Sequence, residues 1–230
     1  MRCRGKGAGA AAALLWIAFW ITLTVRLIAG DGGLMAAEML RLAPPEATGL
    51  PEAEYQAVGL MTAAYLTGGT ETFQHEYTDG SGRKTECFQE HEAAHMADCR
   101  DLIRLDVWVC AACGIAAAGC TAFGLCRREK REGFLRGILT GLRIFAGAAA
   151  VMLAWALADF DGLFVTFHRV AFRNDGWLLD PRTDLLIRLM PETFFITLGI
   201  RGGMRALAMP VILEAAARTC LTINRKKEKQ

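Results

Sequence analysis

Residues 91–126 read HEAAHMADCRDLIRLDVWVCAACGIAAAGCTAFGLC, a stretch that turns from charged to apolar with no proline to interrupt it. We expect one helix that begins near Glu90 and continues into the apolar part, residues 105–126. A helix needs about 20 predominantly apolar residues to cross a bilayer, and segments 10–29, 134–158 and 193–215 meet or nearly meet that length as well. The sequence therefore predicts four transmembrane helices.

The predicted fold class is an all-α membrane core of four transmembrane helices with a small mixed α/β extracytoplasmic domain. Apolar residues at helical spacing predict a short helix over 52–66, and a turn signal at 79–82 predicts two short strands within 70–88. The expected order is a cytoplasmic start with the first membrane helix (1–29), an extracytoplasmic domain (30–104), membrane helices two and three (105–158) with a basic cytoplasmic link (127–133), a second extracytoplasmic segment (159–192), and the fourth membrane helix with a basic tail (193–230).

Basic residues predict the orientation in the cell membrane. They are Arg2, Arg4 and Lys6 at the start, Arg127, Arg128, Lys130, Arg131 and Arg136 after the second apolar segment, and Arg218, Arg225, Lys226, Lys227 and Lys229 in the tail. Since basic flanks favour the cytoplasm, we expect a multi-pass protein with both termini inside and segments 30–104 and 159–192 outside. A cleaved signal peptide is the alternative for segment 10–29, but its apolar region is longer than a usual signal core.

The cysteine pattern does not indicate a disulfide framework, because most of the eight cysteines lie in or beside membrane segments. Only Cys87 and Cys99 are expected outside, where a bridge between them is an open possibility. The basic residues are dispersed flanks rather than an aromatic-studded patch in a soluble domain, so the sequence predicts no nucleic-acid partner.

The pentapeptide HEAAH allows a zinc peptidase interpretation. On a helix, His91 and His95 lie four residues apart on one face, and Glu92 would activate a metal-bound water. A third ligand is required, and His168 or a downstream acid would have to supply it.

A second interpretation uses residues outside the pentapeptide. Glu92, His95 and Asp98 follow each other at helical spacing, and the blocks over 167–180 and 184–195 carry the later pattern F-H-x-x-x-F-x-N-x-x-W-x-L-D and D-x-L-I-x-L-x-P-x-x-F-F. These residues, with the layout of four apolar segments, resemble an integral membrane family of Gram-positive bacteria, the lipoprotein intramolecular transacylases.

The resemblance implies an enzyme that moves the sn-2 acyl chain of a diacylglyceryl lipoprotein onto the amino group of its lipid-bearing cysteine. It also implies that His95 and His168 are the catalytic pair, whereas His91 lies outside the family's pattern. The expected partners are a diacylated lipoprotein and membrane lipid, and no metal or other cofactor is expected.

The chemistry of acyl transfer suits these residue types. An amine that attacks an ester needs a base, an acid for the leaving alkoxide and donors for the oxyanion, and imidazole can move protons near neutral pH. Asp98 or Glu92 would orient His95, and Arg169 or Asn174 would donate to the oxyanion. Trp177 and Asp180 are expected at the membrane interface or against substrate.

Three arginines, Arg143, Arg201 and Arg205, fall within the predicted third and fourth membrane helices with no evident acidic partner. A polar cavity or a lipid headgroup would stabilise them, and snorkelling to the surface is the alternative. The function classes that remain are the transacylase, a zinc peptidase, and a non-catalytic membrane protein of the same fold.

Overall fold

The computed structural model of the chain describes residues 5–227, apart from the side chains of Arg128, Arg225 and Lys227. The basic residues Arg2, Arg4 and Lys229, which also entered the orientation prediction, lie outside the described residues. By its internal contacts the chain divides into two units. The first comprises residues 1–24, 107–160 and 203–230, and the second comprises residues 25–106 and 161–202. Each is described by itself.

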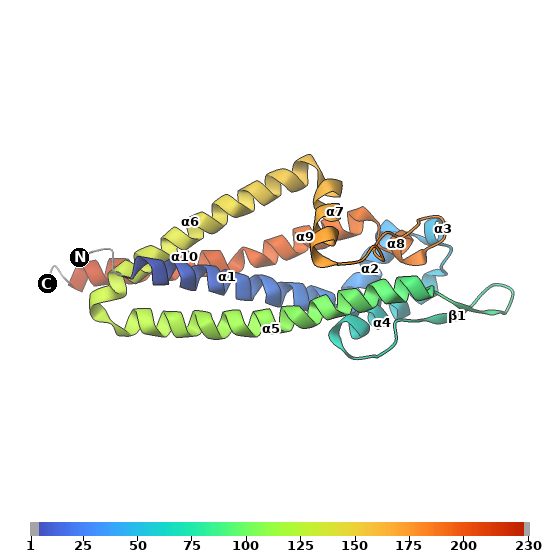
Figure 1. The fold of residues 1–230 in the computed structure, drawn as a ribbon, viewed down its shortest axis with the longest axis horizontal. Helices are drawn as coiled ribbons and strands as arrows, with labels where there is room; N and C mark the ends of the chain where they lie inside the picture. Colours follow the sequence, from blue (N-terminus) through green and yellow to red (C-terminus); the bar gives the residue numbers. More distant parts are fainter. Residues whose placement is uncertain (1–4, 228–230) are drawn as a thin grey trace. The chain divides into compact units, whose positions relative to one another are not determined.

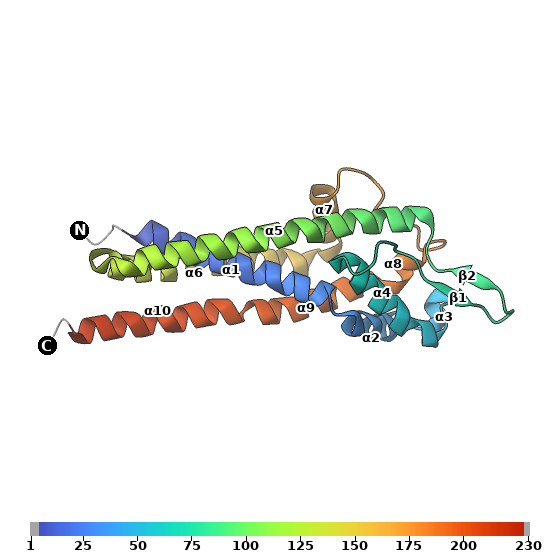
Figure 2. The ribbon, with the colours of Figure 1, turned by 90° about the horizontal axis from the view of Figure 1, so that it is seen from below.

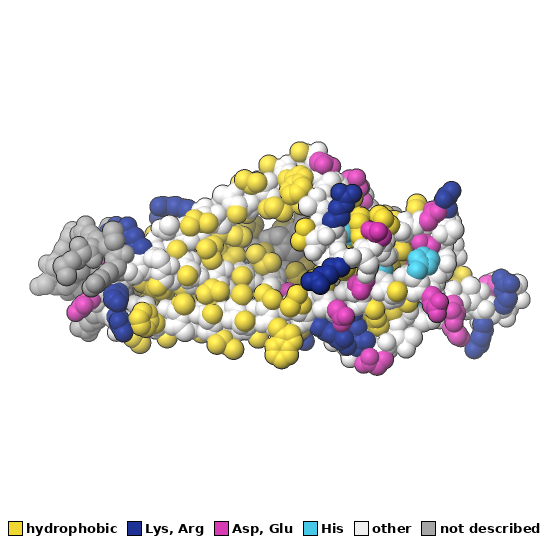
Figure 3. All heavy atoms as spheres, viewed as in Figure 1, with side chains coloured by type: hydrophobic (Ala, Val, Ile, Leu, Met, Phe, Trp, Pro, Cys, Tyr) yellow, Lys and Arg dark blue, Asp and Glu magenta, His cyan; other side chains and the backbone are white. Residues whose placement is uncertain are grey.

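Four helical segments in the described part are long and apolar enough to cross a membrane, as predicted. They are Lys6–Ala29, Glu90–Cys126, Glu129–Ala158 and Glu192–Asn224. In Figure 3, hydrophobic side chains cover much of the surface over the long helices. Exposed apolar side chains such as Ile115, Val151 and Leu157 fit contact with lipid rather than water.

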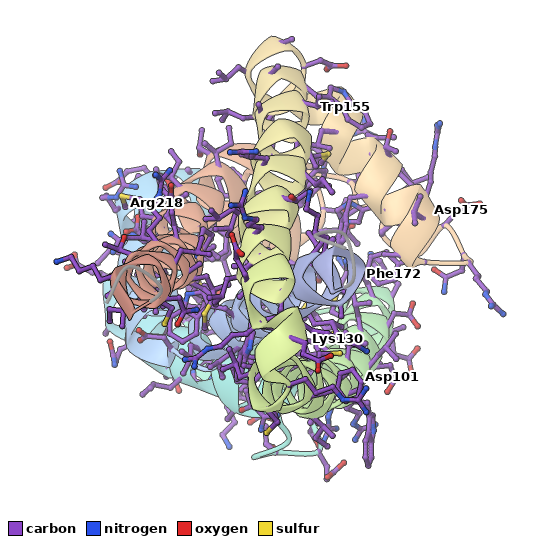
Figure 4. The ribbon with its side chains drawn as sticks, turned by 90° about the vertical axis from the view of Figure 1, so that its left-hand side faces the viewer. Asp101, Lys130, Trp155, Phe172, Asp175 and Arg218 are labelled. Carbon is purple, nitrogen blue, oxygen red and sulfur yellow. The ribbon has the colours of Figure 1, made fainter. Side chains whose placement is uncertain are left out.

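The first unit is built from long helices: α1 (Lys6–Ala29), the later part of α5 (Glu90–Cys126), α6 (Arg128–Ala158) and α10 (Ala208–Lys227). Small residues allow α1 and α6 to approach closely, since a Cβ added at Gly9 would lie 2.0 Å from the carbonyl oxygen of Phe134. Lys130 on α6, Trp155 near the end of α6 and Arg218 on α10 are labelled in Figure 4. The core of this unit contains Ala12, Ala13, Phe134, Leu135, Ile138 and Ala217.

The second unit contains the shorter elements, shown in Figures 1 and 2. They are α2 (Gly32–Leu42), α3 (Pro45–Thr48), the 3-10 helix η1 (Glu52–Glu54), α4 (Tyr55–Thr67), β1 (Glu76–Thr78), β2 (Lys84–Glu86), the start of α5, α7 (Phe160–Ala171), α8 (Leu185–Leu189) and most of α9 (Glu192–Ala206). The two strands pair antiparallel, with Tyr77 opposite Thr85.

Helices α2 and α4 pack side by side in the second unit (Figure 2). A Cβ added at Gly59 would lie 2.6 Å from the backbone nitrogen of Ala36, so glycine is required at this crossing. Around this pair is one buried apolar cluster that includes Met39, Tyr55 and Leu189. The cluster fixes the start of α5 and the segment around α8 against a common core.

Several local predictions are confirmed. The helix expected over 52–66 is η1 followed by α4, the strands expected within 70–88 are β1 and β2, and one helix runs from Glu90 into the second apolar segment. Four helices, α2, α3, α7 and α8, were not predicted. Residues 5–227 are mostly helical, and the sheet found among them is this one short hairpin.

Arg201 has an acidic partner that the sequence did not reveal. Its guanidinium donates to Glu38 on α2, a carboxylate that is only 3% exposed and also accepts from Arg41. Glu38 lies 163 residues away in the chain, so spacing along the fourth apolar segment gave no indication of this ion pair. In the other unit, the backbone carbonyl of Arg205 accepts a hydrogen bond from the indole of Trp20.

Candidate functional site

The second unit brings His95 and His168 together, although 73 residues separate them in the chain. His95 lies on the first turns of α5, and His168 lies near the end of α7. Their ring centroids are 6.2 Å apart and both residues are less than a tenth exposed. At this separation both rings can contact one reacting group in the same site.

The tautomer of His168 follows from its hydrogen bond to the helix backbone. Its Nδ1 lies 2.8 Å from the carbonyl oxygen of Phe164, which can only accept, so Nδ1 carries the proton and Nε2 keeps its lone pair. Burial lowers the pKa of His168 below its ordinary value, against a smaller opposing effect of the Phe164 carbonyl. The ring is therefore neutral near pH 7 and has a free basic nitrogen.

Aromatic rings surround His168. The ring of Phe164 lies 4.1 Å from it, that of Trp177 5.1 Å and that of Phe172 5.6 Å, measured between centroids. The helical spacing of Phe164, His168 and Phe172 places them along one side of α7 and its end. Figure 4 labels Phe172 at this point of the chain.

His95 has a different environment. Its Nε2 lies 3.6 Å from the sulfur of Cys99, one turn further along α5, and its Nδ1 is buried with no hydrogen-bond partner among the described residues. The ring of Phe172 contacts it edge-on at 5.2 Å. One aromatic side chain thus lies against both histidines.

Both histidines line a cavity of about 440 Å³ that lies wholly within the second unit. Its size is in the range of small-molecule sites, and its wall is mainly apolar. The lining residues are Met35, Thr62, Leu66, His95, Met96, Cys99, Leu102, Ile103, Asp161, Phe164, Phe167, His168, Phe172, Trp177, Leu179, Leu186, Ile187, Met190, Glu192, Phe194, Phe195 and Leu198. Such a wall suits a hydrocarbon chain.

Asp98 and Asn174 are joined across the two segments that carry the histidines. The amide nitrogen of Asn174 donates to Asp98 at 2.9 Å, and its amide oxygen accepts from the backbone N–H of Gly176. Asn174 is exposed in the turn after α7, where Asp175 is labelled in Figure 4. The pair ties the end of α7 to α5 rather than offering Asn174 freely to the cavity.

Glu92 is fully buried, and its contacts are to backbone. One carboxylate oxygen accepts from the N–H of Gln89 at 2.7 Å and the other from the N–H of Leu186 at 2.7 Å. Glu92 therefore satisfies amides at the starts of both α5 and α8. It positions the helix that carries His95 without contacting the imidazole itself.

The two histidines of HEAAH have different partners. His91 is half-exposed and its Nε2 lies 3.0 Å from the buried carboxylate of Asp184, whereas His95 is buried next to Cys99 and His168. Among the described residues, no group of three or more His, Cys, Asp or Glu side chains is placed to hold a metal ion. The geometry thus gives no support to the zinc interpretation.

Asp184 is buried and accepts hydrogen bonds from several neighbours. Burial pushes its pKa up, but hydrogen bonds from His91, from the Thr183 hydroxyl and from the amide of Asp180 outweigh this effect, and the pKa lies below its ordinary value. An ionised Asp184 therefore accepts a hydrogen bond from His91. This contact gives His91 a structural role.

The other residues singled out in the sequence have different surroundings. Trp177 lines the cavity, whereas Asp180 is not among the lining residues and both its carboxylate oxygens accept from the guanidinium of Arg182. Arg169 is exposed on α7 directly after His168, and its side chain has no hydrogen bond or ion pair within residues 5–227. Cys87 and Cys99 are both free thiols.

Sequence reasoning missed Cys99 and Phe164 as neighbours of the catalytic candidates. Cys99 lies one turn after His95, and Phe164 one turn before His168, so helical spacing alone would have found both once the helices were assigned. For Phe164 the missing step was the assignment of α7, whereas Cys99 lies on α5, which was predicted.

The comparison with known families decides the class of this protein. The family model for the lipoprotein intramolecular transacylase Lit matches residues 10–195. The chain belongs to this family. It is thus an integral membrane acyltransferase of the Lit class, and a zinc peptidase is not favoured.

Solved structures of Lit share the fold. One is the membrane-integral lipoprotein intramolecular transacylase Lit from Bacillus cereus, with a TM-score of 0.72, 22% identity, and coverage of 96% of this chain and 98% of that chain. A variant of the same protein with one histidine replaced by alanine has a TM-score of 0.69, 22% identity and coverage of 96% of each chain. No curated protein sequence matches the chain.

Proposed function

We propose that this Lit family member transfers the sn-2 acyl chain of a diacylglyceryl lipoprotein to the amino group of the lipid-bearing cysteine, and that His95 and His168 carry the reaction. The observation that supports these roles most is the pairing of two buried imidazoles on the wall of one apolar cavity. The product is the lyso-form lipoprotein, which has a free hydroxyl on its glyceryl group.

The reaction is an exchange of one acyl bond for another within the substrate. The amine nitrogen attacks the ester carbonyl carbon, the bond from that carbon to the glyceryl oxygen breaks, and an amide forms. One proton moves in net terms from nitrogen to the glyceryl oxygen, so neither water nor a redox partner is consumed. Because amine and ester belong to one substrate, correct positioning supplies several kcal/mol of the barrier reduction, of the order of 7 for well-oriented groups.

His168 has the properties of the proton carrier. Its Nε2 lone pair is free because Nδ1–H is engaged with Phe164, and its lowered pKa keeps the ring neutral at the pH where an amine attacks. It takes the proton from the attacking amine and returns it to the departing glyceryl oxygen. Positioned acid–base groups of this kind contribute about 10²- to 10⁴-fold in rate.

His95 complements this role as a donor to the oxyanion. An N–H on its buried Nδ1 would have no acceptor, so the proton is favoured on Nε2. A neutral imidazole N–H in a site of low dielectric stabilises the charge that develops on the carbonyl oxygen. These steps use no metal ion. The two carboxylates that were predicted to orient His95 have other contacts: Glu92 accepts from backbone amides and Asp98 accepts from Asn174.

The membrane is the source of the substrate. The apolar cavity fits an acyl chain, and Trp177 on its wall has an amphipathic ring of the kind that lies at headgroup level. We place both termini in the cytoplasm and the second unit on the outer side, because Arg127, Lys130, Arg131 and Lys226 follow the positive-inside rule. Lipoproteins present their acylated amino end at that surface.

Expression in a bacterial host that lacks a Lit enzyme tests the function. Mass spectrometry of a host lipoprotein should then show one acyl chain on the amino nitrogen and one on the glyceryl group, at unchanged total mass relative to the diacylated form. Fragmentation distinguishes the two because the amide-linked chain stays with the peptide. A lipoprotein that keeps both chains on glycerol, with this protein present in the membrane, would refute the proposal.

A further inference from the structure

The thiol of Cys99 has no role in the reaction as described, yet it is the only side chain within hydrogen-bond range of the His95 ring among the described residues. Its sulfur lies 3.6 Å from Nε2, and both residues line the cavity. Cys99 and His95 are four residues apart on α5, so the helix itself sets this contact.

The two ring nitrogens of His95 differ sharply in their surroundings. Nδ1 is buried and has no partner, whereas Nε2 faces a sulfur atom. With the proton on Nδ1, that nitrogen would be an unpaired buried N–H donor. With the proton on Nε2, Nδ1 is an unpaired buried acceptor, which proteins tolerate more readily, and the Nε2–H finds a weak acceptor in the thiol sulfur. The pair of contacts therefore selects the tautomer with hydrogen on Nε2.

We infer that Cys99 is a positioning residue, whose sulfur accepts the Nε2–H of His95 and holds that proton ready for the carbonyl oxygen of the substrate. The inference rests on the proposed function and deepens it. A sulfur acceptor suits this task because it is weak, so the developing oxyanion takes over the N–H at little cost. A carboxylate in the same place would compete with the oxyanion.

A covalent role for the thiol is the rival interpretation, in which Cys99 carries the acyl chain as a thioester. The surroundings disfavour it. Reactive cysteines lie near cations or helix N-termini, but Cys99 is on the third turn of α5, in an apolar wall and next to Asp98 in the chain. Each of these features opposes the thiolate that would be needed.

Ring-nitrogen NMR tests the tautomer without depending on activity. The chain contains four histidines, so each signal of ¹⁵N-histidine-labelled protein is assigned by single substitutions. We expect His95 in the wild type to carry its proton on Nε2, Cys99→Ala to give a mixture of tautomers, and Cys99→Ser to restore the Nε2–H form through its oxygen acceptor. A proton on Nδ1 in the wild type, or an identical tautomer in Cys99→Ala, would overturn the inference.

Kinetics of the same variants complete the test. Loss of one weak hydrogen bond should lower kcat of Cys99→Ala about three- to ten-fold with KM unchanged, and Cys99→Ser should regain most of it. Cys113→Ala, which removes a thiol from the other unit, is the control and should leave kcat unchanged.

Complete loss of activity in both Cys99 variants, with a thioester on Cys99 found by mass spectrometry in the wild type, would assign the covalent role instead. Absence of transacylation by the wild type would refute the proposed function and leave the NMR result to judge Cys99.

Discussion

At the scale of the residue, His168 should remain neutral over an unusually wide pH range for an imidazole. Burial lowers its pKa, so the ring gains its proton only when the pH falls below the ordinary value of about 6.5. NMR titration of the ring, assigned with His168→Gln, should give a midpoint below 6.5. More than half of the His168 rings are then neutral at pH 6.5. A midpoint at or above 6.5 would contradict the account of a neutral proton carrier.

The residues of the site were predictable to different degrees. His95 and His168 stand in recognisable sequence patterns, but their protonation states depend on Phe164, Cys99 and burial, which spacing alone did not reveal. Glu92 was predicted as an orienting group for His95, and its buried contacts are instead to backbone amides. A carboxylate next to a histidine in a sequence does not say which way it points on the helix.

At the scale of the element, Glu92 joins α5 to α8. Its two oxygens accept from the amides of Gln89 and Leu186, so Glu92→Gln leaves a single acceptor oxygen and turns an N–H group toward an amide donor. We expect a loss of about 1–3 kcal/mol of stability, read as a lower thermal unfolding midpoint in detergent. Glu90→Gln, at an exposed neighbouring position, is the matched control and should change little. Equal midpoints for the two variants would refute this role.

The elements nearest to membrane segments were the hardest to predict. No helix was predicted in segment 159–192, which is short and mixes apolar, basic and turn residues, yet its first part is the helix α7 that carries His168. Burial of one side of α7 against the cavity stabilises it more than helix propensity does. Helix α5 was predictable because its apolar run and its lack of proline extend over many turns.

At the scale of the whole molecule, the proposed orientation in the membrane rests on the positions of basic residues alone, and it is testable. An epitope is inserted at Ser81, in the exposed turn between β1 and β2. Antibody should bind it in cells whose envelope outside the cytoplasmic membrane is permeabilised but whose cytoplasmic membrane is intact. The same epitope after Gln230 should be reached only when the membrane is opened. The reverse pattern would place the histidine pair on the cytoplasmic side and exclude the lipoprotein substrate.

Four apolar segments were enough to predict the membrane class and the number of candidate spans in the described residues. Long-range pairs such as Glu38 with Arg201 were not predictable, because ion pairs between distant helices leave no periodic signal in one sequence. The same limit applies to the approach of α5 and α7 that forms the site.

The most direct measurement compares three histidine variants by lipoprotein mass spectrometry in a host without a Lit enzyme. His95→Ala and His168→Ala should each lower lyso-form production by about 10²-fold or more, since each removes a group that acts on the reacting atoms. His91→Ala should retain nearly wild-type production, because His91 contacts Asp184 and not the other two rings. Full production by His95→Ala or His168→Ala, or loss confined to His91→Ala, would contradict the account.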